Sequence, residues 1–177
     1  MDKAYGGGGS TMMKIKMIAK QLTKPEVLKY IIAGIILIYI VILLIFTSGS
    51  TKSFSEVRKK VEKAISQEEL QQESGQKFKR YYGLNAADYE GVMLYSAKSS
   101  MSAEEILLVK TKTDEQVKEV ERAIEKRLEK RMLDFEGYAP EQVRMLEQAQ
   151  ISVRGKFVLC VVSPEVSVYV TAFSKAL

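Results

Sequence analysis

The longest apolar stretch of the chain, residues 31–46, contains no charged side chain and only the hydroxyl of Tyr39 as a polar group. As a helix it rises about 24 Å, and apolar neighbours on both sides extend it toward the roughly 30 Å of a hydrocarbon layer. Thr23 and Glu26 have the spacing of a capping box at its start. We therefore predict a transmembrane signal-anchor helix over residues 24–48.

After a small polar spacer at residues 49–52, helical and strand patterns fill residues 53–177. Apolar residues at helical spacing predict helices from Ser53 to about Ile65 and over residues 76–82. The clearest helix is predicted over residues 114–135, where Val117, Val120, Ile124, Leu128, Met132 and Phe135 form one stripe. The charged residues between them are typical of a solvated helix face and not of a binding site.

Short apolar runs predict four strands, at residues 92–97, 106–110, 151–153 and 157–162. A short helix is expected from Pro140 to about Ala149. From Val166 onward the spacing favours a helix, although alternating valines keep a strand as a competing interpretation. Hairpin-connected strands separated by helices predict an α+β fold, namely a two-layer domain with a small antiparallel sheet packed by helices.

Positive charge is concentrated near the N-terminus. The net charge is +5, and residues 1–30 carry six lysines against Asp2 and Glu26. A basic flank of this kind favours contact with anionic lipid, whereas a nucleic-acid partner needs a basic face on the folded domain. We therefore predict a basic N-terminal segment over residues 1–23, a membrane as partner and no nucleic acid.

The segment ahead of Met12 and Met13 contains Gly6 to Gly9, which is what a ribosome-binding site encodes when it is translated in frame. We expect the native chain to start at Met12 or Met13, and a linker left by cloning is the alternative.

Basic residues close to the predicted span do not decide its orientation, because both flanks carry four of them. The order of basic segment, apolar core and polar spacer is that of a signal sequence, which favours a C-terminal domain outside the cell membrane. Ser48 and Ser50 also fit a cleavage site, so a cleaved signal peptide stays open, although the apolar core is longer than most.

The sequence contains no arrangement that requires a particular chemistry. Histidine is absent, and the one cysteine, Cys160, has apolar neighbours typical of a buried thiol. Ser96 and Lys98 share a strand face and are the only pair that resembles a nucleophile and a base. Asp134 and Glu136 could bind a cation but are more typical of solvated carboxylates. We predict no catalytic residue, no metal site and no cofactor.

The segment after Gly137 is the best candidate for a binding site. Gly137 can end the long helix, and Pro140 fixes the start of the next, so the turn between them is stiff. Two interpretations are open for this turn: Tyr138 packs beneath it, or Tyr138 forms a partner contact with Glu141 and Gln142. The predicted binding residues are Tyr138, Pro140, Glu141 and Gln142.

Four segments carry a resemblance to a known family. They are AEEILLVK at residues 103–110, the long charged helix, GYAPEQVRMLEQA at 137–149 and VRGKFVLCVVS at 153–163. Over roughly residues 82–173 the chain resembles domain-of-unknown-function family 4358, found mainly in Gram-positive anaerobes. The resemblance implies an extracytoplasmic domain held by a lipoprotein signal or a single span, with no assigned activity. This chain lacks the lipoprotein cysteine, and its spanning helix would take that role.

Together these observations predict a membrane-anchored extracytoplasmic domain, a non-enzymatic module that binds an envelope component or another membrane protein. Two alternatives remain: an envelope hydrolase that uses Ser96 and Lys98, and a cytoplasmic-facing regulator of a membrane partner.

Overall fold

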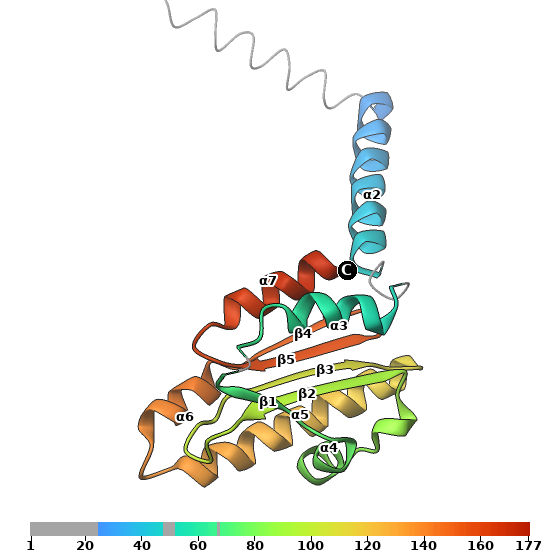
Figure 1. Ribbon diagram of the computed structural model, residues 1–177. Helices are drawn as coiled ribbons and strands as arrows, with labels where there is room; N and C mark the ends of the chain where they lie inside the picture. The colour runs from blue at the N-terminus through green and yellow to red at the C-terminus, as the bar shows by residue number, and fades with distance from the viewer. Residues whose placement is uncertain (1–24, 48–51, 67) are drawn as a thin grey trace, which may run out of the picture. The chain divides into compact units, whose positions relative to one another are not determined.

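The computed structural model describes residues 25–47, 52–66 and 68–177, and the chain divides into two compact units, Met1–Ile45 and Phe46–Leu177 (Figure 1). The predicted basic segment with its start at Met12 or Met13 lies outside the described residues. So does most of the predicted spacer.

Helix α2, Pro25–Thr47, contains the apolar stretch of the sequence. Pro25 is its first residue, where the missing N–H costs no helical hydrogen bond. Side chains are described for residues 28–43, and all of the large apolar ones there are exposed. No helix in the described part of the chain is both long enough and apolar enough to cross a membrane. The predicted transmembrane helix is thus unsupported by the structure, which confirms only that this stretch is helical.

The second unit is built on a five-stranded antiparallel sheet with strand order β1-β2-β3-β5-β4. The strands are β1, Leu70–Gln72; β2, Gly91–Ala97; β3, Glu105–Lys110; β4, Gln150–Arg154; and β5, Phe157–Val162. The four predicted strands are confirmed within one or two residues. Strand β1 was not predicted, because three residues with only one buried side chain leave no recognisable alternation.

Helices cover both faces of this sheet, and the predicted two-layer arrangement is therefore wrong (Figure 1). Every residue of β3 and β5 is buried. Neighbouring residues of β3 enter opposite cores, with Ile106 and Leu108 in one and Leu107 and Val109 in the other. Such continuous apolar strands need cover on each face, since a two-layer domain would leave half of these side chains in water.

On one face lie α3, Phe54–Glu62, and α7, Val166–Ala176. Helix α3 begins where the Ser53 hydroxyl accepts a hydrogen bond from the backbone N–H of Glu56 at 3.3 Å. The ring of Phe54 packs directly on Gly91 of β2, where a Cβ would lie 2.2 Å from the ring. Helix α7 confirms the helical interpretation of the C-terminal segment over the competing strand.

On the other face lie α4, Gly75–Tyr82, α5, Asp114–Phe135, and α6, Pro140–Glu147. The expected apolar stripe of α5 is confirmed, with Val117, Val120, Ile124 and Phe135 buried. Thr113 and Gln116 form a capping box at its start. Gly137, which has a φ of 84°, turns the chain from α5 into α6.

Candidate functional site

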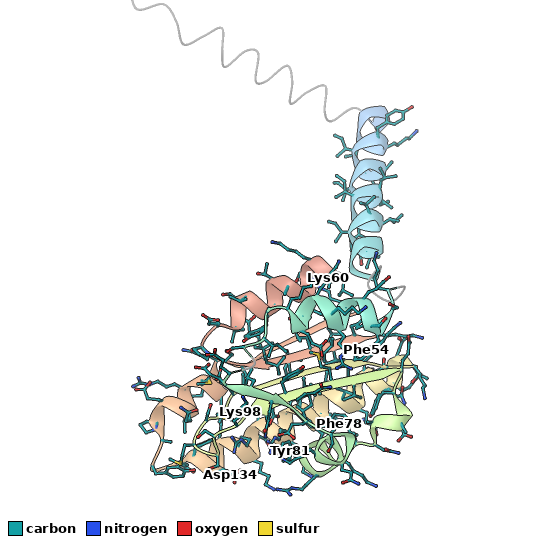
Figure 2. All side chains as sticks on the ribbon, viewed as in Figure 1. Phe54, Lys60, Phe78, Tyr81, Lys98 and Asp134 are labelled. Carbon is teal, nitrogen blue, oxygen red and sulfur yellow. The ribbon has the colours of Figure 1, made fainter. Side chains whose placement is uncertain are left out.

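A polar cavity of about 310 Å³ opens on the face of the sheet that carries α4 and α5. Helix α4 contributes Arg80 and Tyr81, and α5 contributes Arg127, Lys130, Arg131 and Asp134. Strands β2 and β3 and the loop between them supply the remaining wall, which includes four serines, Ser96, Ser99, Ser100 and Ser102. Figure 2 shows Tyr81 beside α4 and Asp134 near the C-terminal end of α5. The cavity has the size of a small-molecule site.

At the inner end of this cavity lies a buried ion pair between Glu105 of β3 and Arg127 of α5. Arg127 donates from Nη2 to Oε2 of Glu105 at 2.7 Å and from Nε to Oε1 at 3.2 Å. The two side chains are only 10% and 8% exposed, for Arg127 and Glu105 respectively. The Tyr82 hydroxyl also donates to Oε1 of Glu105. This bidentate geometry neutralises both charges and fixes the direction of the guanidinium.

Burial and the ion pair shift the pKa values of Arg127 itself and of the neighbouring Tyr82. Burial alone lowers the pKa of Arg127, but its hydrogen bonds to the Glu105 carboxylate outweigh this, so the pKa lies above its usual value. Burial, together with Glu105, raises the pKa of Tyr82 well above its ordinary value. Arg127 also stacks over the ring of Tyr81, with 4.0 Å from Cζ to the ring centroid. Arg127 is therefore held by the Glu105 carboxylate and by the Tyr81 ring.

Arg131, one helical turn further along α5, is less well satisfied. Its Nη2 donates to the carbonyl oxygen of Ser102 at 3.0 Å, and its Cζ lies 4.5 Å from the ring centroid of Phe135. Its Nη1 lies 3.9 Å from Oδ2 of Asp134, beyond hydrogen-bonding distance. Its Nε is buried and has no hydrogen-bond partner among the described residues. Burial and the nearby charge of Arg127 lower the pKa of Arg131.

The loop from β2 to β3 forms the outer wall of the cavity and is rich in serine. The Ser99 hydroxyl accepts from the backbone N–H of Met101, and the Ser102 hydroxyl accepts from the backbone N–H of Glu104, each at 3.2 Å. A hydroxyl that accepts in this way keeps its own proton for donation. The loop therefore turns hydrogen-bond donors toward its surroundings.

Ser96 and Lys98, the candidate nucleophile and base, each have another partner. The Ser96 hydroxyl donates to Oε1 of Glu73 at 2.6 Å, and Nζ of Lys98 donates to the backbone carbonyl of Glu68 at 2.9 Å. Burial raises the pKa of Glu73, but hydrogen bonds from Ser96, Lys77 and Gln71 outweigh this and lower it overall. A carboxylate with a lowered pKa is a weak base toward a serine hydroxyl.

The structure separates the four predicted binding residues by role. Pro140 is the first residue of α6, and Glu141 is exposed with Oε1 3.8 Å from Nη1 of Arg144. Gln142 accepts a hydrogen bond through Oε1 from the backbone N–H of Ala103 at 2.7 Å. Gln142 therefore holds the serine loop of the cavity, a role that its place in the sequence did not indicate.

Tyr138 is 59% exposed, and its ring centroid lies 5.8 Å from that of Phe135. The interpretation in which Tyr138 packs beneath the turn is therefore wrong. The turn is held instead by backbone hydrogen bonds from Tyr138 and Ala139 to the carbonyl of Phe135. A partner contact through Tyr138, Glu141 and Gln142 stays a prediction.

Replacing Tyr138 by Ala is expected to lower the free energy of unfolding by less than about 1 kcal/mol, because the lost contact is one exposed aromatic pair. Chemical denaturation followed by circular dichroism measures the change. The matched control is Phe135→Ala, which removes a fully buried ring. It should lower the free energy of unfolding far more than Tyr138→Ala does. A Tyr138→Ala protein as unstable as Phe135→Ala would mean that Tyr138 supports the core.

The other residues singled out from the sequence are Cys160, Asp134 and Glu136. Cys160 is a free, buried thiol, and burial with the nearby Glu105 raises its pKa to about 12. The predicted buried thiol is thus confirmed. Asp134 lies on the cavity wall, while Glu136 caps the end of α5. Within the described residues, no three metal-ligating side chains come together.

The charged face of α5 is where the sequence analysis was wrong. Arg127 and Arg131 were assigned to a solvated face, yet both turn inward to the cavity. A signal was available: Val120, Ile124, Arg127 and Arg131 follow each other at spacings of four, three and four. Two arginines that continue an apolar stripe indicate cations held against the body of the domain.

No curated protein and no solved structure matches this chain. One family model does, that of a domain of unknown function (DUF4358), over residues 63–163. The match takes in β1 and nearly all of α4, which lie ahead of the resemblance seen in the sequence, and it ends one residue after β5, short of α7. It includes both members of the buried ion pair and every side chain of the cavity wall. Because the match spans more than half of the chain, the protein belongs to the DUF4358 family.

Proposed function

We propose that this protein is a membrane-anchored, extracytoplasmic binding domain without enzymatic activity, and that it recognises an envelope component or another membrane protein. Helix α2 is the anchor, and the sheet domain is the binding part.

The observation that carries the proposal is the apolar surface of α2. Between Val27 and Thr47 the helix has one charged residue, Lys29, and its large apolar side chains from Leu28 to Leu43 are exposed. Exposed apolar surface of this extent marks a protein or membrane contact. That this surface enters the hydrocarbon layer follows in this proposal from the sequence stretch predicted to span, residues 24–48. Lys29 lies within one turn of the N-terminal end, where its ammonium can reach the headgroups.

The orientation rests on the order of segments. Six lysines precede Ile31, and small polar residues follow Phe46 before the domain begins. This is the order of a signal-anchor, which places the basic side in the cytoplasm. A non-enzymatic role is favoured by the contacts of Ser96, whose proton is already shared with the weakly basic Glu73.

Thiol labelling of intact cells tests the anchor and the orientation together. Cys160 should not react with a membrane-impermeant maleimide, because it is 3% exposed and its pKa is about 12. In the Ser167→Cys protein, the new thiol lies on an exposed position of α7 and should be labelled without lysis. The labelled chain should remain with the membrane after alkaline washing.

Lys14→Cys is the control on the other side of the predicted span and should react only after lysis. Labelling of Ser167→Cys only after lysis would contradict the orientation and favour the cytoplasmic-facing regulator. Recovery of a shortened domain in the medium would contradict retention of the anchor and favour cleavage near Ser48 or Ser50. A chain that lacks residues 25–47 should leave the membrane fraction.

A further inference from the structure

We propose that the cavity between α4, α5 and the serine loop binds an oxyanion, a phosphate or carboxylate group of the ligand. This inference rests on the proposed binding role and names the chemistry of what is bound. Arg131 and Lys130 of α5, Arg80 of α4 and the serine hydroxyls of the β2–β3 loop form the site.

The charge of the cavity favours an anion. Four cationic and three carboxylate side chains line it. Glu105 is fully engaged by Arg127 and Tyr82, and Glu104 accepts from the Ser163 hydroxyl at 2.9 Å. Among the described residues, Arg80 and Lys130 have no carboxylate partner within 4 Å, and Arg131 has only Asp134, at 3.9 Å. Cations gathered in a concave, partly desolvated site attract an anionic group more strongly than they would on an open surface.

Arg131 supplies the second and independent observation. Its side chain is 20% exposed on the cavity wall, and of its donors only Nη2 makes a hydrogen bond within the described residues. A buried cation with unfilled donors is costly for the fold unless something compensates it. An oxyanion in the cavity beside Nη1 would compensate the charge in the bidentate manner that guanidinium groups favour.

The serine loop complements the arginines. Ser99 and Ser102 accept hydrogen bonds from the backbone and keep their protons for donation, so the wall opposite α5 presents donors. Gln142 and Arg131 hold this loop through Ala103 and Ser102. The wall is therefore fixed on both sides before any ligand arrives, which reduces the entropy cost of binding.

The same geometry limits the ligand to one anionic group. Asp134 lies on the rim, 3.9 Å from Arg131, and would repel a second negative charge. Arg127 lies over one face of the Tyr81 ring, and Arg80 lies 5.9 Å from the ring centroid, so this ring is paired with cations. A single phosphate or carboxylate attached to a neutral, hydroxyl-bearing group fits the remaining wall.

Isothermal titration calorimetry on the full chain in non-ionic detergent tests the proposal with three probes: inorganic phosphate, glycerol 3-phosphate and N-acetylalanine. We expect saturable binding of at least one probe with a Kd of about 1 mM or below, weakened by added salt. Tighter binding of the two phosphates indicates a phosphate-bearing ligand, and tighter binding of N-acetylalanine indicates a peptide carboxylate.

Two variants locate the site. Arg131→Gln should raise the Kd of the bound probe at least about 10-fold. The double variant Arg80→Gln with Lys130→Gln, measured separately, should raise it at least about 10-fold as well. The double variant changes only exposed side chains, so it tests the site even if Arg131→Gln does not fold. The matched control, Arg122→Gln with Lys126→Gln, removes two exposed charges of α5 outside the cavity. Its Kd for the probe should stay within about twofold of the parent value.

The proposed site is wrong if none of the three probes binds saturably. It is also wrong if the control variant weakens binding of the probe as much as the two site variants do. Neither outcome affects the thiol labelling that tests the anchor, so failure of the cavity and failure of the proposed function are distinguished.

Discussion

Replacing Arg127 by Met is expected to lower the free energy of unfolding by about 3–5 kcal/mol, because it leaves the carboxylate of Glu105 buried without its partner. The side chain of Glu105 is only 8% exposed, and Arg127 provides two of its three hydrogen bonds. With Arg127 shortened to Met, the Glu105 carboxylate keeps only the Tyr82 hydroxyl as a donor among the described residues. Chemical denaturation followed by circular dichroism measures the loss.

Two further variants separate the charge effect from simple loss of packing. Lys126→Met removes the neighbouring, exposed cation of the same helix and should stay within about 0.5 kcal/mol of the parent. Glu105→Gln combined with Arg127→Met removes both charges and keeps an acceptor for Tyr82, so it should recover about 2 kcal/mol of the deficit. If Arg127→Met alone lowers the free energy of unfolding by less than about 1 kcal/mol, the prediction is wrong. Water then reaches the Glu105 carboxylate and compensates for the lost guanidinium.

The domain is expected to lose stability at alkaline pH through Cys160. Its pKa rises from an ordinary 9.0 to about 12 in the folded chain, so the folded state disfavours the thiolate. The stability linked to the neutral thiol is fully present below pH 9 and is lost as the pH rises through 12. At 1.36 kcal/mol per pKa unit, the free energy of unfolding should fall by about 2–3 kcal/mol between pH 9 and pH 11.

Cys160→Ala isolates this effect, since alanine cannot ionise. Tyr89 also has a raised pKa, of about 12, caused by burial and by Glu119, and it contributes to alkaline loss in both proteins. The difference in free energy of unfolding between the parent and Cys160→Ala should therefore narrow as the pH rises above 9. Parallel stability curves up to pH 11 would show that the thiol ionises without cost and is reached by water.

Most of the secondary structure followed from local pattern. Helix α5 was predicted with both ends correct, because a stripe of six apolar residues at helical spacing is unambiguous over 22 residues. Gly137 follows the end of α5 with positive φ, as its place in the sequence indicated. Strand β1 had no comparable signal, because it depends on pairing with β2 far away in the chain. The inward turn of Arg127 was indicated only by its place on the apolar stripe of α5, and its partner Glu105 was not indicated at all.

The sequence by itself determined the helices and strands other than β1, the family and the buried thiol. It also contained the reason for a third layer, since the uninterrupted apolar runs of β3 and β5 need cover on both faces, but it did not say which helices provide that cover. Only the tertiary structure decided the site. Arg127 meets Glu105 across 22 residues of chain, and Gln142 reaches Ala103 across 39. These contacts exist because antiparallel pairing of β2 with β3 and packing of α5 on the sheet bring distant polar groups into one small, desolvated space, which no local periodicity records.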